Sequence, residues 1–195
     1  MPSEMGLARL VRRRVNPQPM MHLKRIVPLA ALLLFLATSV IGSAEEIRPP
    51  FGLRWGETAE RMERLLKGAK AVVVERRLIA GREAWSVEGL VQSGLRRTMF
   101  YFSGGELVEV ELQYQREEWD ESKYDGFMGD VRRRLEQRYG QGQLIARKKE
   151  PEGEVTQTLV GYKWNQNNTA IELVYFAAQT TEEVFRTLSV HYKVL

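Results

Sequence analysis

The chain has 195 residues, 29 Lys and Arg against 25 Asp and Glu, a formal net charge of +4, and no cysteine. The lack of cysteine excludes disulfides, thiolate metal sites and cysteine nucleophiles. The length predicts one domain, or two small halves that share one core.

The first 44 residues predict a leader. Lys24 and Arg25 precede an apolar run from Ile26 to Ile41, and the small residues 42–44 follow it. A basic segment, an apolar segment and a small-residue cleavage site are typical of a secretory signal peptide. The run is shorter than the ~20 residues that a membrane-spanning helix needs. We therefore expect cleavage after Ala44, and an uncleaved single-span anchor is the alternative.

Residues 1–19 are arginine-rich and show no hydrophobic period. The simplest explanation is a mis-called start, with translation beginning at Met20 or Met21. A long basic segment of the signal peptide is the second explanation. A nucleic-acid-binding arm is the least favoured, because export would remove it.

The positive charge belongs to the leader. Residues 1–44 hold six of the 29 cations and one of the 25 acids, so residues 45–195 carry 23 cations, 24 acids and a net charge of −1. That balance leaves no argument from net charge that the mature domain binds nucleic acid or anionic membranes. The chain also lacks the anchoring cysteine of bacterial lipoproteins. We expect a soluble protein of a bacterial periplasm, with a secreted protein as the alternative.

Residues 54–116 predict a helix and four strands. Thr58 is the expected N-cap, Met62, Leu65 and Leu66 form an apolar stripe, and Gly68 ends the helix. Strands are expected at residues 71–79, 83–91, 98–103 and 106–115, with a tight turn at 104–105. In the fourth strand, alternation predicts a buried set and a wet set. These are Val108, Val110, Leu112 and Tyr114 against Glu109, Glu111, Gln113 and Gln115.

Residues 120–195 predict the same order again. Apolar residues at steps of three and four predict a helix over 120–139, with Asp120 as N-cap and Gly140 after its end. Gly126 and Gly129 cost this helix about 1 kcal/mol each against Ala, and close packing on the sheet is one explanation for them. Strands are expected at residues 143–149, 155–164, 169–176 and 184–194, with a turn at 151–153.

Short hairpins throughout predict an α+β fold: an antiparallel β-sheet of about eight strands, from a tandem helix-plus-four-strand repeat, with two helices on one face. Trp55-Gly56-Glu57-Thr58 precedes the first helix, and Arg138-Tyr139-Gly140 closes the second. In these features the chain resembles the β-lactamase-inhibitor-protein-like and BamE (SmpA)-like envelope domains. Those families show a Gly-x-Thr/Ser opening before the helix and a Gly after it. This chain lacks the lipid-anchoring cysteine of BamE and the cysteine pairing of the inhibitor proteins. The resemblance implies a binding domain and does not identify its partner.

The sequence predicts no catalytic residue, metal ligand or cofactor. His191 is the one histidine after the leader, which excludes His-His zinc motifs and a second-histidine relay. A Ser-His-Asp triad is formally possible, but no Gly-x-Ser-x-Gly elbow is present. Glu109 and Glu111 share one strand face, whereas acid/base catalysis needs carboxylates in unlike environments. We interpret these two glutamates, His191 and Arg132–Arg134 as solvated surface groups. An unusual hydrolase that uses a carboxylate or His191 is the alternative.

Alternation divides the aromatic residues between the two faces of the sheet. The helix-facing set is Trp85, Phe100, Phe102, Tyr114, Tyr162, Trp164 and Tyr192. The opposite face mixes aromatic, apolar and charged residues, as protein-binding surfaces do. This candidate partner-binding face consists of Met99, Tyr101, Glu109, Glu111, Leu159, Lys163, Phe185, His191 and Lys193.

The predicted function is a non-enzymatic protein-binding or envelope-assembly module with another envelope protein as its partner. Nucleic acid is not expected as a partner. Membrane contact is expected only through an uncleaved leader.

Overall fold

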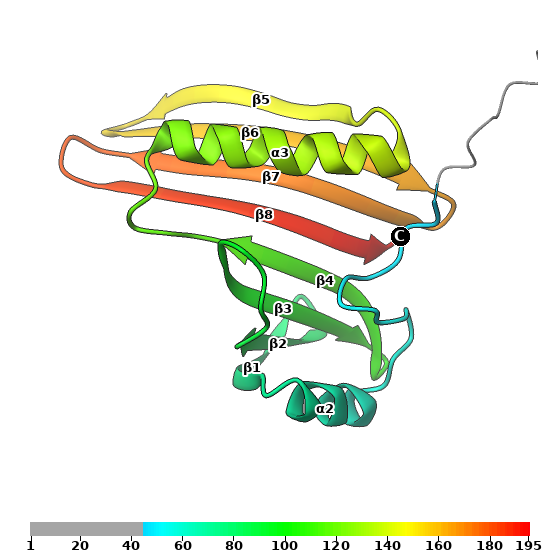
Figure 1. Ribbon diagram of the computed structural model, residues 1–195. Helices are drawn as coiled ribbons and strands as arrows, with labels where there is room; N and C mark the ends of the chain where they lie inside the picture. The colour runs from blue at the N-terminus through cyan, green and yellow to red at the C-terminus, as the bar shows by residue number, and fades with distance from the viewer. Residues whose placement is uncertain (1–44) are drawn as a thin grey trace, which may run out of the picture. The chain divides into compact units, whose positions relative to one another are not determined.

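The computed structural model describes residues 45–195 (Figure 1). The predicted leader, its cleavage site and the alternative starts lie outside the described residues. The first half of the described chain contains α2 (Ala59–Gly68), β1 (Val72–Ile79), β2 (Arg82–Glu88), β3 (Leu95–Ser103) and β4 (Glu106–Tyr114). The second half contains α3 (Glu121–Tyr139), β5 (Gln143–Glu152), β6 (Val155–Gln166), β7 (Thr169–Gln179) and β8 (Val184–Val194). Within residues 45–195, no helix is long and apolar enough to cross a membrane.

The strands form one eight-stranded antiparallel sheet, which confirms the predicted α+β fold. Its order is β1-β2-β3-β4-β8-β7-β6-β5, so β1 and β5 are the edges. The two meanders meet at the β4–β8 pair, from Glu109 opposite Lys193 to Tyr114 opposite Leu188. The helix-then-four-strand order occurs twice. That the two halves of the chain are a tandem structural repeat stays a prediction.

Both helices begin where the sequence predicts. The Thr58 hydroxyl accepts a hydrogen bond from the Arg61 N–H at 3.4 Å, and the Asp120 carboxylate accepts one from the Lys123 N–H at 2.8 Å. These side chains satisfy N–H groups that have no partner inside the first turn. Gly140 ends α3 with a φ of 82°, in the region that glycine adopts without strain.

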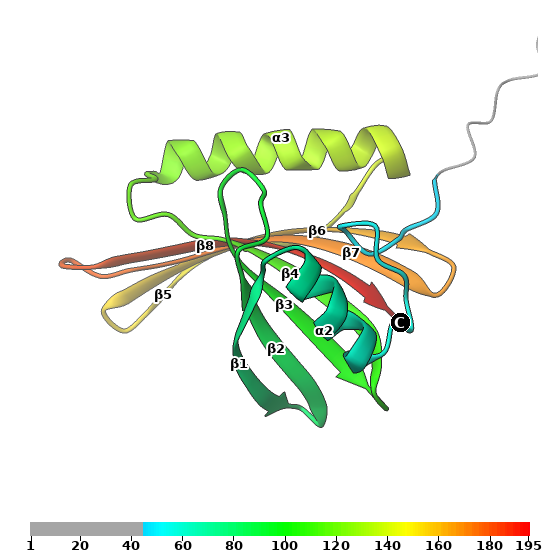
Figure 2. The ribbon, with the colours of Figure 1, turned by 60° about the horizontal axis from the view of Figure 1, so that its bottom comes forward.

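The main core lies on one face of the sheet, under the two helices. Buried side chains from α2 (Met62, Leu66) and from α3 (Tyr124, Met128, Val131, Leu135) join one continuous cluster. All seven aromatic residues predicted to face the helices belong to it: Trp85, Phe100, Phe102, Tyr114, Tyr162, Trp164 and Tyr192. Figure 2 shows α3 along one side of the β5–β8 half. The opposite face, which we call the open face, carries no helix within the described residues.

The predicted position of Val108 is wrong, because β4 contains a bulge. Phe102 lies opposite Leu107 and Tyr101 lies opposite Glu109, which leaves Val108 without an opposite residue on β3. Leu107 is fully buried in the main core, whereas Val108 packs on the open face. The extra residue shifts the alternation by one position from there toward the turn. Val110, Leu112 and Tyr114 lie beyond the bulge and are buried as predicted.

Two further expectations are wrong. Gly126 and Gly129 are exposed, and a Cβ at either position would meet nothing within 4 Å, so they do not mark close packing. Pro151 belongs to β5, not to a turn. Because β5 is an edge strand with a partner on one side only, a proline without an N–H donor is tolerated there.

Candidate functional site

The open face carries two adjacent rows of polar residues across the middle of the sheet. Opposite residues of antiparallel strands share a face. One row therefore runs from Glu111 on β4 through His191 on β8 and Glu172 on β7 to Lys163 on β6. In the adjacent row, Glu109 lies opposite Lys193. The register of the sheet thus gathers side chains that are up to 84 residues apart in the sequence, as for Glu109 and Lys193 (193 − 109).

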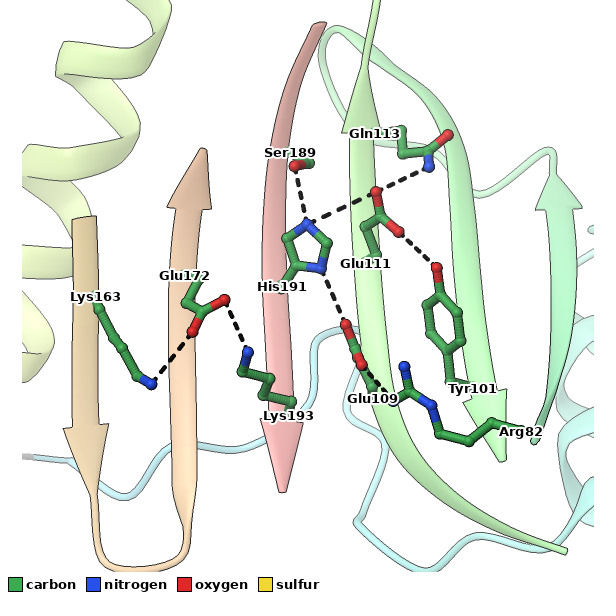
Figure 3. Close-up of polar contacts among 10 residues, drawn as sticks. All are labelled: Arg82, Tyr101, Glu109, Glu111, Gln113, Lys163, Glu172, Ser189, His191 and Lys193. Atoms are coloured by element: carbon green, nitrogen blue, oxygen red, sulfur yellow. Dashed lines mark hydrogen bonds and ion pairs between the residues drawn. The ribbon is translucent and has the colours of Figure 1, made fainter. Parts of the chain in front are cut away.

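The β4–β8 part of these rows is a connected set of ion pairs and hydrogen bonds (Figure 3). Arg82 Nη1 lies 2.6 Å from Glu109 Oε2, and His191 Nδ1 lies 3.0 Å from Glu109 Oε1. The Tyr101 hydroxyl donates to Glu111 Oε2 at 2.8 Å. Glu111 Oε1 lies 3.7 Å from His191 Nε2. The imidazole of His191 is therefore held between two carboxylates.

The β6–β8 part is built around one carboxylate. Glu172 lies between two ammonium groups, with Lys193 Nζ at 2.8 Å and Lys163 Nζ at 3.3 Å. We call the two parts together the polar network; its members are Arg82, Tyr101, Glu109, Glu111, Lys163, Glu172, His191 and Lys193.

The interpretation of Glu109, Glu111 and His191 as solvated surface groups is wrong. Their side chains are 10%, 12% and 23% exposed. A second, smaller apolar cluster on the open face explains this burial: Ala84, Met99 and Tyr101, with Ile79 and Val108 against them. The Arg82 guanidinium lies 4.8 Å above the Tyr101 ring and covers this cluster. The centre of the open face is therefore ordered and largely shielded from water.

Neighbouring charges shift the pKa values in this network. Burial lowers the pKa of His191, but the hydrogen bond to Glu109 and the charge of Glu111 outweigh it, so this pKa is raised above its ordinary value. Burial raises the pKa of Glu109, but His191 and Arg82 outweigh it and hold that pKa below its usual range. Burial and the charge of Glu111 raise the pKa of the Tyr101 hydroxyl.

The pKa of Glu172 is lowered in the same way. Burial opposes ionisation of this carboxyl, but the hydrogen bonds and charges of Lys193 and Lys163 outweigh it. Neighbouring groups therefore favour the charged forms of Glu109, Glu172 and His191, and acidic and basic side chains alternate along the rows.

Three residues lie in the order that a serine hydrolase needs. Ser189 has the place of the nucleophile, His191 that of the base and Glu109 that of the acid that orients the base. Ser189 Oγ is 3.0 Å from His191 Nε2, on the far side of the ring from Glu109. Glu111 lies beside the same Nε2 and favours the imidazolium, which cannot accept the serine proton. Ser189 is 8% exposed, and it lines none of five hollows found on residues 45–195. The arrangement is an ion-pair network more than a reaction centre.

No group of three or more His, Cys, Asp and Glu side chains in residues 45–195 is placed to hold a metal ion.

The open face becomes apolar toward the β5–β6 and β7–β8 hairpins. Leu159 lies opposite Phe176, and the Phe176 and Phe185 rings are 6.3 Å apart. Phe185 is 47% exposed. A hollow of about 360 Å³ adjoins them, lined by Lys148, Glu150, Pro151, Glu152, Gln157 and Leu159. This end offers the exposed side chain of Phe185 on the same face of the sheet as the polar network.

The predicted face residues fall into three groups. Met99, Tyr101, Glu109, Glu111 and His191 lie together on β3, β4 and β8. Lys163 and Lys193 join them through Glu172. Leu159 and Phe185 lie at the apolar end, away from the other seven.

Sequence reasoning missed Arg82, Glu172 and Phe176. Period-2 alternation with the buried residues Ile171, Leu173 and Tyr175 would have placed Glu172 and Phe176 on the open face. No local pattern indicates Arg82, because it reaches Glu109 from the start of β2 across β3.

Comparisons of the chain with protein-family models, with curated proteins and with solved structures found no match. The resemblance to the β-lactamase-inhibitor-protein-like and BamE-like domains therefore stays a prediction.

Proposed function

We propose that this chain is an exported, non-enzymatic protein-binding module of the bacterial envelope, and that it docks its partner on the open face of the sheet. The observation that carries this proposal is that one face of the sheet presents both fixed charges and apolar side chains. An ordered set of half-buried charges lies on the same face as the exposed Phe185 and the half-buried Phe176 and Leu159.

The polar network suits recognition more than catalysis. Its charges are fixed by their neighbours, so a partner meets a preorganised pattern and does not have to order flexible side chains. Lys163 and Lys193 remain 24% and 26% exposed, so their ammonium groups can still reach a partner. The charges of the network alternate in sign along the rows. This pattern favours a partner whose charges alternate in the complementary order over a ligand that carries charge of one sign.

The apolar end supplies the anchor that such a surface needs. Aromatic side chains carry much of the binding energy at protein interfaces when they are buried there. Phe185 is exposed and packs against Phe176 only on one side. A partner that covers Phe185 and the hollow beside Leu159 buries apolar area without breaking a hydrogen bond of the network.

Site-specific photo-crosslinking in cells that express the full coding sequence tests this proposal. A photoreactive side chain at Phe185 or at Lys163 is expected to capture one and the same protein. The matched control position is Arg133, which is exposed on α3 on the opposite side of the sheet. Capture from Arg133 alone, or from none of these positions, would contradict the proposal.

The affinity for the captured protein then tests which residues act. Phe185→Ala is expected to weaken binding by about tenfold or more, as loss of an aromatic anchor does. Arg133→Ala is expected to leave the affinity unchanged.

The order Ser189–His191–Glu109 is the observation that favours a hydrolase as the second candidate. An activated serine would react with a fluorophosphonate probe, and Ser189→Ala would abolish the labelling. Our proposal expects no labelling of the folded protein at neutral pH.

A further inference from the structure

Among residues 45–195, the sheet has two edges without a partner strand, β1 and β5, and they differ. β5 contains Pro151, which cannot donate a hydrogen bond, and it presents the successive cations Arg147, Lys148 and Lys149. Proline and clustered like charges are devices that prevent edge strands from pairing with other chains. β1 contains no proline, and its exposed side chains include Val72 (60%), Val74 (49%) and Leu78 (76%). The edge of β1 is thus the less protected one.

From these features we infer that β1 pairs with β1 of a second copy of this chain, antiparallel and about a two-fold axis, with the axis at Arg76. The two sheets then continue into one another. This interface is separate from the open-face site and does not rest on the function proposed above.

Symmetry restricts how two copies of β1 can pair. Opposite residues must lie on the same face of the joined sheet, so the axis passes through a residue and not between two residues. An axis at Glu75 places Glu75 opposite its own copy, and an axis at Arg77 does the same for Arg77. Both registers bring like charges together.

The register centred on Arg76 is self-complementary. It places Glu75 opposite Arg77 of the second copy, twice, and Val74 opposite Leu78 of the second copy, twice. Both Glu75 and Arg77 are exposed, and neither makes an ion pair within residues 45–195. Opposite charges and apolar pairs at directly opposed positions stabilise strand pairing.

Arg76, which lies at the axis, is compatible with this register. Its guanidinium lies 4.2 Å above the Trp85 ring, and its charge is paired with Glu63 on α2. The side chain is therefore turned away from the free edge and neutralised.

The β-bulge between Val73 and Glu75 shortens the regular part of this edge. One short strand pair buries less area than a standard interface, so we expect a dissociation constant in the micromolar range or weaker.

Sedimentation equilibrium of the protein, expressed from the full coding sequence, tests the inference. The wild type is expected to show a monomer–dimer equilibrium. Glu75→Arg alone and Arg77→Glu alone each place like charges opposite one another, and each is expected to weaken the dimer by about tenfold or more.

Two further measurements identify the register. The double variant with Glu75→Arg and Arg77→Glu restores opposite charges and is expected to restore the dimer. An equimolar mixture of the two single variants is expected to form heterodimers. Lys149→Glu on the β5 edge is the control, and it is expected to leave the equilibrium unchanged. A wild type that stays monomeric up to millimolar concentration, or a dimer that Lys149→Glu disrupts and the β1 variants do not, overturns the inference.

Discussion

At the scale of single residues, His191 is the residue whose environment depends most on how the strands pair. Its imidazole lies between Glu109 and Glu111 and is 23% exposed. The sequence placed all three residues on the same face correctly, because period-2 alternation decides faces. It did not predict their burial, because the cluster that shields them comes from three other segments of the chain: Ile79, Ala84 and Met99.

The raised pKa of His191 predicts a pH-dependent contribution to stability. A group whose pKa is higher in the folded protein stabilises it fully below the unfolded pKa of ~6.5, and this contribution is lost as the pH rises through the folded pKa. His191→Gln is therefore expected to lower the free energy of unfolding by about 1–2 kcal/mol below pH ~6.5. At higher pH the difference between the two proteins is expected to shrink.

Urea denaturation of both proteins at a series of pH values measures this difference. Lys193→Gln on the same strand is the control, since it removes a positive charge from the same rows and leaves the imidazole of His191 in place. A His191→Gln effect that is the same at every pH would contradict the prediction.

The bulge in β4 predicts unequal costs at two neighbouring residues. Leu107 is fully buried in the main core, whereas Val108 is half-buried on the open face. Leu107→Ala is expected to destabilise the protein by about 2–5 kcal/mol, and Val108→Ala by about 1 kcal/mol. Urea denaturation measures both free energies. The simple alternation of the sequence predicts the reverse order, so the comparison separates the two readings.

At the scale of helices and strands, Gly126 and Gly142 show that spacing alone does not reveal packing. Gly126 is exposed on α3, with nothing within 4 Å of where a Cβ would be. A Cβ on Gly142, which follows α3, would lie 2.5 Å from the Trp164 ring. The Trp164 Nε1–H donates to the Gly140 carbonyl at 2.8 Å. The tight glycine is therefore the one between the helix and β5, where the chain passes over a tryptophan.

Alanine substitutions at these glycines are expected to act in opposite directions. Gly126→Ala is expected to stabilise the protein by about 0.5–1 kcal/mol, because glycine is a poor helix former. Gly142→Ala is expected to destabilise it by about 1–3 kcal/mol, because the Trp164 ring must shift. Thermal unfolding measures both changes, with Gly129→Ala as a second exposed position that should behave like Gly126→Ala. Stabilisation by Gly142→Ala would show that Trp164 moves freely.

Element types were predictable, but the order of the strands was not. Each hairpin is local, so turn residues and alternation were enough to predict eight strands in meanders, and β8 has the predicted bounds. The β4–β8 pair joins segments more than 70 residues apart, and no local pattern indicates it. The polar network spans that pair, so its central contact between His191 and Glu109 was equally invisible in the sequence.

At the scale of the whole molecule, the start of the described chain bears on the predicted cleavage after Ala44. The Glu45 N–H donates to the Arg138 carbonyl at 3.4 Å, and the Glu45 carboxylate lies 2.7 Å from Arg138 Nη2. Arg138 is in the last turn of α3, whose final carbonyls have no donors within the helix. Cleavage after Ala44 would turn this N–H into a positively charged amino group, which a helix C-terminus favours.

The cleavage predicted from the sequence and this geometry together lead to two expected results. N-terminal sequencing of the exported protein is expected to give a chain that begins at Glu45. Acetylation of that terminus removes its charge and is expected to lower the free energy of unfolding by about 0.3–1 kcal/mol at low salt, an effect that added salt reduces. A start upstream of residue 26, with the protein in the membrane fraction, would instead support the uncleaved anchor. In that case the residue 45 N–H stays an amide, and α3 keeps its hydrogen bond without the added charge.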